Sequence, residues 1–116
     1  MEFIEYSKCS TCKNAKKFLN ENNIKYIDRE IKDNNLTKEE IKNIINKYNI
    51  DINKLFNTSG LIYRSLDLKN KLKDLKINEK IELLTNNPML VKRPLLINDK
   101  FILIGFKINE WKEKVL

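Results

Sequence analysis

The sequence predicts an α/β domain in which a mixed four-stranded sheet is interrupted by a helical segment. A strand–helix–strand pattern opens the chain, a long middle stretch has helical periodicity without strand-like alternation, and the clearest hairpin comes near the end. At 116 residues the chain is long enough for one hydrophobic core and too short for two independent ones. We therefore expect a single domain.

The first half of the predicted sheet comes from the start of the chain. Residues 2–6 read as a short strand, apolar positions recur at helical spacing from Ser10 to Asn22, and residues 25–31 read as a second strand. These elements make a βαβ unit. Its two strands should be parallel, and its crossover should be right-handed.

The middle of the chain is predicted to be helical. Thr37 is followed three residues later by Glu40, which is the spacing of a capping box. From residue 51 to residue 75 we expect short helices joined by turns. Asn78 is predicted to cap a further helix that ends just before Pro88. The helix after Thr37 carries one apolar stripe, made of Ile41, Ile44, Ile45 and Tyr48.

The last third of the chain predicts a hairpin and a closing helix. Residues 95–97 and 101–105 are apolar and flank the polar turn at residues 98–100. The closing helix then places apolar side chains on one face, which we interpret as core packing. These side chains are Ile108, Trp111 and Val115.

The order βαβ, helices, ββα is that of a thioredoxin-like fold with an inserted all-helical subdomain. We expect the thioredoxin-like core over residues 1–32 and 89–116 and the helical insertion over residues 33–88. A C-x-x-C motif at the start of the first helix and a proline directly before the third strand are where that fold places its chemistry.

The two cysteines, Cys9 and Cys12, lie at the predicted strand-to-helix turn and are flanked by Lys8 and Lys13. Backbone N–H groups and the positive end of the helix dipole favour a thiolate at such a turn. We expect Cys9, at the N-cap, to be the exposed nucleophile and Cys12 to be the resolving thiol. The alternative is a pair of small buried hydrophobic residues, which free cysteines often are.

Other uses of the C-x-x-C motif are disfavoured. Zinc usually takes four N or S ligands, and the chain has no histidine and no further cysteine, so no metal site is expected. The chain begins with Met1-Glu2 and shows no signal-peptide pattern, which predicts a cytoplasmic protein in which a lasting disulfide would be unusual. No apolar run approaches the ~18 residues of a membrane helix, so no membrane association is expected.

The formal net charge of +7 would admit an anionic partner. However, no basic cluster is interleaved with aromatic residues, so we expect a solvated surface and no direct nucleic-acid binding. A guanidinium is a planar bidentate fork that lysine cannot replace, which makes each arginine a candidate for binding an oxyanion. The arginines are Arg29, Arg64 and Arg93.

Three segments at characteristic separations carry a family resemblance: YSKCSTCKNAKK at residues 6–17, LFNTSGLIYR at residues 55–64 and NPMLVKRPL at residues 87–95. On these segments the chain resembles the arsenate reductase (ArsC)/Spx family, and most closely its ArsC-like members of the YffB and YusI type. The similarity runs from Tyr6 to Trp111. It implies a thioredoxin-like fold and a nucleophilic cysteine at Cys9.

In family members that reduce arsenate, this cysteine attacks the oxyanion, arginines hold its oxygens, and glutathione with glutaredoxin completes the reduction. Arg64 and Arg93 match two of those arginine positions, whereas residues 104–106 (Ile-Gly-Phe) replace the third. The reductases carry a small hydroxyl residue at the position of Cys12. A disulfide between Cys9 and Cys12 can therefore form here, and arsenate is not the expected substrate.

The resemblance leads to the interpretation of the chain as a thiol–disulfide oxidoreductase, with Cys12 or glutathione as the resolving thiol. Arg64 and Arg93 are expected to bind the anionic part of the substrate, unless they only form surface salt bridges. Pro94, if cis rather than a trans turn residue, would present backbone to the thiol substrate. The expected co-substrate is glutathione or a dithiol reductant such as glutaredoxin or thioredoxin, with no bound cofactor and a monomeric chain. Two further substrate-binding candidates lie between the cysteines, Ser10 and Thr11.

The alternative is a redox-sensing regulator of the Spx/MgsR type, which would bind the C-terminal domain of the RNA polymerase α subunit. Spx-type members use a glycine for that contact, in the segment corresponding to residues 49–53. No glycine is present in that segment. The regulator is therefore the second interpretation.

Overall fold

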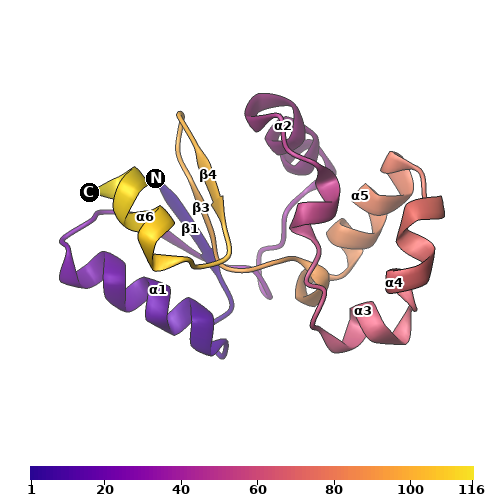
Figure 1. Cartoon of the computed structure of the whole chain (residues 1–116), viewed down its shortest axis with the longest axis horizontal. Helices are drawn as coiled ribbons and strands as arrows, with labels where there is room; N and C mark the ends of the chain where they lie inside the picture. The colour runs from indigo at the N-terminus through magenta and orange to yellow at the C-terminus, as the bar shows by residue number, and fades with distance from the viewer. The chain divides into compact units, whose positions relative to one another are not determined.

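The computed structural model describes residues 1–116, and the chain divides into two compact units. The first, which we call the sheet unit, contains Met1–Glu30 and Arg93–Leu116. The second, the helical unit, is the continuous segment Ile31–Lys92. Figure 1 shows the sheet strands, α1 and α6 in the first unit and α2 to α5 in the second. No helix is both long enough and apolar enough to cross a lipid bilayer.

The sheet unit contains the predicted mixed four-stranded sheet. Strands β1 (Glu2–Glu5), β2 (Ile27–Glu30), β3 (Leu95–Ile97) and β4 (Ile102–Ile104) are arranged in the order β2-β1-β3-β4. Strand β1 pairs parallel with β2 and antiparallel with β3, and β3 pairs antiparallel with β4. The predicted βαβ unit and the predicted hairpin are therefore both confirmed. Strand β3 has the expected bounds, whereas β1, β2 and β4 are shorter than the segments expected from the sequence.

Two helices, α1 (Ser10–Glu21) and α6 (Ile108–Val115), cover one face of this sheet. Side chains alternate between the faces of a strand, and the register places Phe3 beside Leu96 and Leu96 beside Leu103 on the helix-covered face. The core on this face comprises Phe3, Ala15, Phe18, Leu19, Leu96, Leu103 and Trp111.

Trp111 is the largest fully buried side chain and anchors α6 to the sheet. Its ring meets Phe106 edge-on with 5.0 Å between centroids. Its indole N–H donates to the carbonyl oxygen of Gly105 at 3.0 Å. Gly105 has a φ of 75°, a left-handed conformation that residues with a Cβ rarely adopt, so glycine suits this bend between β4 and α6.

The helical unit begins with the predicted capping box. Thr37 Oγ1 accepts from the Glu40 N–H at 3.1 Å, and Glu40 Oε1 accepts from the Thr37 N–H at 2.9 Å. Helix α2 (Lys38–Tyr48) follows and buries Ile41 and Ile44. The remaining α-helices are α3 (Leu61–Ser65), α4 (Leu68–Lys71) and α5 (Ile77–Asn86). Short 3₁₀ turns join them at Ile52–Leu55, Leu72–Asp74 and Pro88–Leu90.

The helical unit is tied together near its C-terminal end. Phe56 and Val91 form an isolated antiparallel bridge. On either side of it, the Asn57 N–H donates to the Leu90 carbonyl and the Lys92 N–H donates to the Leu55 carbonyl, both at 2.7 Å. Because these bonds join residues more than thirty positions apart, they close the insertion on itself just before the chain re-enters the sheet unit.

Two expectations about the helices were wrong. Helix α5 is capped by Lys76 rather than by Asn78, because the Glu79 carboxylate accepts from the Lys76 N–H at 2.9 Å and fixes the helix start there. Ile108 is 47% exposed and does not belong to the core, since it is the first residue of α6 and lies at the open end of the helix. Two apolar residues of the middle segment, Leu61 and Leu66, are likewise exposed.

Candidate active site

Cys9 lies at the N-cap of α1, at the end of the turn that leaves β1. The Cys9 N–H donates to the Tyr6 carbonyl at 2.9 Å, which closes a β-turn with Ser7 and Lys8 at its centre. Cys9 has an extended backbone, with φ −88° and ψ 124°, while its carbonyl accepts the first helical bond from the Lys13 N–H at 3.0 Å. The Cys9 side chain therefore occupies the position from which N-cap residues meet the unpaired N–H groups of the first helical turn.

The pKa of the Cys9 thiol is lowered from its ordinary value. Partial burial acts in the opposite direction, but it is outweighed by hydrogen bonds from the Cys12 backbone and thiol and from the Thr11 backbone, and by the charge of Arg93. Cys9 is also partly accessible. It therefore combines the two properties that a nucleophilic thiolate needs.

The Cys12 thiol has the opposite environment. Cys12 is fully buried, one turn inside α1, and burial is the main cause that raises its pKa to about 12. The neighbouring Cys9 adds to the increase, while a hydrogen bond from the Tyr6 backbone and the charge of Arg93 act against it. Of the two free thiols, Cys9 is thus the more acidic and the more accessible.

Arg93 is the first residue of the chain after it returns to the sheet unit. Its guanidinium lies over the ring of Tyr6, with 5.4 Å between Arg93 Cζ and the ring centroid. The Arg93–Pro94 peptide bond is cis, and Pro94 is buried directly before β3. The Pro94 carbonyl accepts from the Gly105 N–H at 2.8 Å. The sheet unit therefore brings together three of the predicted site residues, Cys9, Cys12 and Arg93, with Pro94 next in the chain.

The other predicted anion-binding residues are placed as follows. Ser10 and Thr11 are the first two residues of α1, and both are exposed. Arg64 belongs to the helical unit, where it lies in the last turn of α3 with an exposed side chain. Helix α3 begins after Gly60, where an added Cβ would lie 2.8 Å from the side-chain amide nitrogen of Asn57 and would displace that side chain.

Comparison with known proteins was made on the sequence and on the fold. The model of the ArsC family matches residues 4–114, almost the whole chain. The chain belongs to the ArsC family. YusI of Bacillus subtilis is 40% identical over 113 residues, which are 97% of this chain and 96% of YusI. The resemblance noted from the three sequence segments is thereby confirmed.

Two further relatives are a solved structure and a named transcriptional regulator. The crystal structure of an ArsC-family related protein from Bacteroides fragilis superposes with a TM-score of 0.90 at 48% identity, covering 96% of this chain and 93% of the other. A protein named global transcriptional regulator Spx 2, from Bacillus anthracis, is 28% identical over 102 residues, which are 88% of this chain and 76% of Spx 2. The thioredoxin-like fold class is thus confirmed.

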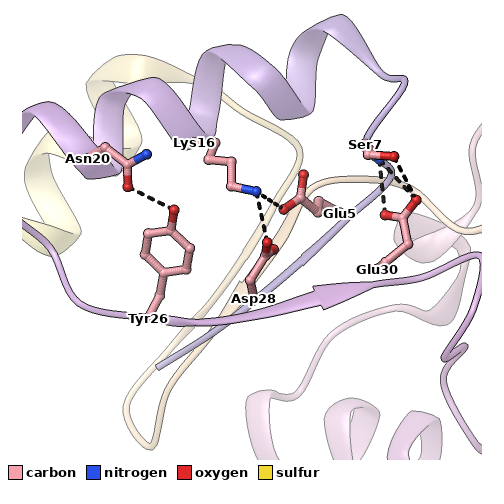
Figure 2. A network of polar contacts seen from close by, with 7 residues as sticks. All are labelled: Glu5, Ser7, Lys16, Asn20, Tyr26, Asp28 and Glu30. Atoms are coloured by element: carbon pink, nitrogen blue, oxygen red, sulfur yellow. Dashed lines mark hydrogen bonds and ion pairs between the residues drawn. The ribbon is translucent and has the colours of Figure 1, made fainter.

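This ArsC-family chain also has an ion-pair cluster beneath α1 that the sequence analysis missed, in which only Glu5 is buried (Figure 2). Lys16 Nζ lies 2.8 Å from Glu5 Oε2 and 2.8 Å from Asp28 Oδ2. Glu5 is 3% exposed, and its burial, followed by a hydrogen bond with Asp28, raises its pKa to about 7 against the opposing effect of Lys16. Lys16 lies one helical turn after Cys12, so a titratable carboxyl group lies under the same part of the helix as the buried thiol.

The charges of Lys16 and Asp28 adjust to this arrangement. Hydrogen bonds with Asp28 and Glu5 raise the pKa of Lys16, so it remains a cation. Burial acts to raise the pKa of Asp28, but hydrogen bonds with Glu5 and Lys16 outweigh it and lower the pKa. The signal for this cluster was present in the period-two alternation of β1 and β2, which puts Glu5 and Asp28 on the face that α1 covers.

A second missed contact holds the turn before Cys9. The Ser7 N–H donates to Glu30 Oε1 at 3.2 Å and to Oε2 at 3.0 Å, and the Ser7 hydroxyl donates to Oε1 at 3.0 Å. Glu30 is the last residue of β2, and Figure 2 shows its carboxylate pointing at the Ser7 backbone and hydroxyl. The two residues are 23 positions apart, and no local pattern in the sequence links them.

Proposed function

We propose that this ArsC-family protein is a thiol–disulfide oxidoreductase with Cys9 as the nucleophile. The observation that supports this most directly is the asymmetry of the two thiols. Cys9 is accessible and acidic at a helix N-cap, while Cys12 is buried and holds its proton one turn away. The accessible Cys9 thiolate can attack a disulfide, and the second thiol one turn away can resolve the adduct.

The reaction proceeds in two exchanges. The Cys9 thiolate attacks one sulfur of a substrate disulfide, a mixed disulfide forms, and the other half of the substrate leaves as a thiolate. Cys12 then loses its proton and attacks Cys9 Sγ, and the second half of the substrate leaves with that proton as a thiol. Where glutathione resolves instead, its thiolate attacks the substrate sulfur of the mixed disulfide, which releases the Cys9 thiolate and leaves the second half of the substrate as a disulfide with glutathione. Where Cys12 resolves, an external dithiol or glutathione reduces the Cys9–Cys12 disulfide and restores both thiols.

Arg93 is proposed to hold an anionic group of the substrate beside Cys9. A carboxylate of glutathione would accept two parallel charge-assisted hydrogen bonds from the guanidinium. The backbone around the cis Arg93–Pro94 bond, together with Ser10 and Thr11 at the helix start, would line the same site. Arg64 is retained as a proposed second anion-binding residue, on the family resemblance alone.

Arsenate is expected to be a poor substrate. At the position of the third arginine of the reductases, Gly105 is buried and the Phe106 ring packs against Trp111, so this segment supplies no cation. Losing one charge-assisted contact to an anion costs about 1.5–3 kcal/mol, or about ten- to a hundredfold in affinity.

A turnover assay tests this proposal. Wild-type protein and the Cys9→Ser and Cys12→Ser variants would be compared on a glutathione mixed disulfide and on arsenate, with glutathione and glutaredoxin as the reducing system. We expect turnover of the mixed disulfide that Cys9→Ser abolishes, and weak or no turnover of arsenate. Robust arsenate reduction would show that the third arginine is dispensable, and no turnover of either substrate would contradict the enzyme proposal.

A second candidate function is redox-sensing regulation, which is favoured by the similarity to Spx 2 and to the regulatory protein MgsR of Bacillus subtilis, 28% identical over 110 residues. In this case oxidation of Cys9 and Cys12 would alter docking to the C-terminal domain of the RNA polymerase α subunit. A pull-down with that domain, with and without oxidant, tests the regulator. Redox-dependent capture together with absent turnover would favour it over the enzyme.

A further inference from the structure

The turn that carries Cys9 is held from outside by one carboxylate. Both oxygens of Glu30 accept hydrogen bonds from Ser7, two from its backbone N–H at 3.2 and 3.0 Å and one from its hydroxyl at 3.0 Å. Ser7 is the second residue of the Tyr6–Cys9 turn, directly after the residue whose carbonyl receives the Cys9 N–H. The contact therefore holds the first half of the turn, and the first half of the turn sets the position of Cys9 at its end.

The sheet register explains why Glu30 reaches this turn. Strands β1 and β2 are parallel, and Glu30 pairs with Glu5, so both strands end at the same level with both carboxylates on the α1-covered face. Glu5 shares Lys16 with Asp28. Glu30 instead extends past the end of β1 to Ser7, two residues further along the chain, as Figure 2 shows.

We propose that Glu30 is a positioning residue for Cys9, a role that rests on the proposed function of Cys9 as the nucleophile. By holding the Ser7 N–H and hydroxyl, Glu30 keeps the Tyr6–Cys9 turn closed, and the closed turn keeps Cys9 at the N-cap of α1, where the unpaired N–H groups of the first helical turn lie. Charge-assisted hydrogen bonds are about twice as strong as neutral ones, which suits a carboxylate to this role.

A positioning role and a direct electrostatic role of Glu30 predict opposite results. A carboxylate near a thiol disfavours the thiolate, so if its charge were decisive, removing it would lower the pKa of Cys9. If positioning is decisive, removing the carboxylate opens the turn, weakens the hydrogen bonds to the Cys9 sulfur, and raises that pKa. Glutamine separates the two roles, because its neutral amide can still accept from the Ser7 N–H.

The test is the pH dependence of Cys9 alkylation by iodoacetamide, with the modified cysteine assigned by mass spectrometry. In Glu30→Ala we expect the pKa of Cys9 to rise by about one unit and alkylation at neutral pH to slow about tenfold. In Glu30→Gln we expect a rate within about twofold of wild type, because one amide can replace the contacts. Glu21→Ala is the matched control, since Glu21 is an exposed glutamate near the far end of α1 that approaches only Lys17, at 3.8 Å.

The other groups around Cys9 are the same in all these variants. They are Arg93 and Cys12, which act on its pKa, and the Glu5 carboxyl group, whose own pKa is about 7. A difference between Glu30→Ala and Glu30→Gln therefore reports on the turn itself. Equal profiles for these two variants, whether unchanged from wild type or both shifted to lower pKa, would overturn the positioning role.

Ser7→Ala decides the question if Glu30→Ala does not fold. This variant removes the hydroxyl contact and leaves the backbone contact. We therefore expect alkylation of Cys9 to slow by only about two- to threefold, because one of the hydrogen bonds from Ser7 to Glu30 is lost. A Ser7→Ala profile identical to wild type would also overturn the proposal. The alkylation readout uses no disulfide substrate, so a wild-type protein without turnover would count against the proposed function and leave this result intact.

Discussion

Arg93 Cζ lies 5.4 Å from the centre of the Tyr6 ring, so the guanidinium that we propose to bind the substrate packs on an aromatic face. The backbone of Tyr6 contacts the backbone of Cys9, and the backbone of Arg93 continues into Pro94. Tyr6 accepts the Cys9 N–H, and Arg93 leads into the cis Pro94. A cation–π contact contributes about 0.5–2 kcal/mol, depending on how far it is desolvated. The ring of Tyr6 thus helps to keep a charge that lowers the pKa of Cys9 in place.

Replacing this ring should make Cys9 less acidic. In Tyr6→Leu the guanidinium loses its aromatic support, so we expect a higher pKa of Cys9, whereas Tyr6→Phe keeps the ring face and should behave as wild type. The ultraviolet absorbance of the thiolate, followed through a pH titration, measures this. Tyr63→Leu, a half-buried tyrosine of the helical unit, serves as the control. A Tyr6→Leu titration that matches wild type would mean that Arg93 holds its place without the ring.

Charge alone should not replace Arg93. Arg93→Lys keeps a cation but loses the planar fork, so we expect turnover of a glutathione mixed disulfide to fall about tenfold or more, mainly through a higher KM. Lys92→Ala should be close to wild type, because the contact of Lys92 with Leu55 is made by its backbone N–H. If both variants keep normal turnover and unchanged circular dichroism, Arg93 does not bind substrate.

Mild oxidation should join Cys9 to Cys12 within one chain. Two cysteines on the first turn of a helix can meet the Cα separation of about 4.4–6.8 Å that a disulfide needs. We expect the mass to fall by two hydrogens, with no covalent dimer on a non-reducing gel. Cys12→Ser is the control and should give only mixed disulfides or dimers. Two thiols that persist in oxidised wild type would rule out Cys12 as the resolving residue.

Glu5 should make the protein less stable as the pH rises toward and through neutrality. Its pKa is about 7 in the folded state against an ordinary 4.5, so between these values the folded state binds more protons than the unfolded state. The stabilisation is complete below the lower value and lost as the pH passes the higher one. Between about pH 5 and about pH 8 the loss amounts to about 2–3 kcal/mol of unfolding free energy.

Urea unfolding at about pH 5 and about pH 8 measures this dependence. In Glu5→Gln the difference between the two conditions should largely disappear, because no carboxyl remains to titrate. Glu21→Gln, which changes an exposed glutamate at the end of α1, should keep the wild-type difference. A wild-type stability that does not fall between the two pH values would contradict the raised pKa.

Local patterns predicted most elements of the fold. The βαβ unit and the hairpin follow from the spacing of apolar residues, and the start of α2 follows from Thr37 and Glu40, which interact over three residues. The start of α5 was misplaced because asparagine is a favoured N-cap residue type and lysine is not, so Asn78 was preferred over Lys76. The side chain of Glu79 decides between them by reaching back to the Lys76 N–H.

The site was only partly predictable, for a physical reason. The positions of Cys9 and Cys12 are consequences of one helix start, so the motif itself predicts them. The contacts of Glu30 with Ser7 and of Arg93 with Tyr6 join residues that are distant in sequence, and they depend on strand register and on where the chain returns to the sheet. Neither quantity can be obtained from composition or periodicity in one segment.

The covalent path between the two units has a consequence at the thiol site. The chain crosses from one unit to the other only twice, at the Glu30–Ile31 and Lys92–Arg93 peptide bonds. At the first crossing, the Glu30 carboxylate accepts from the Ser7 N–H. At the second, the Arg93 guanidinium lies over the Tyr6 ring. Both residues of the sheet unit at which the chain crosses therefore contact the turn before Cys9.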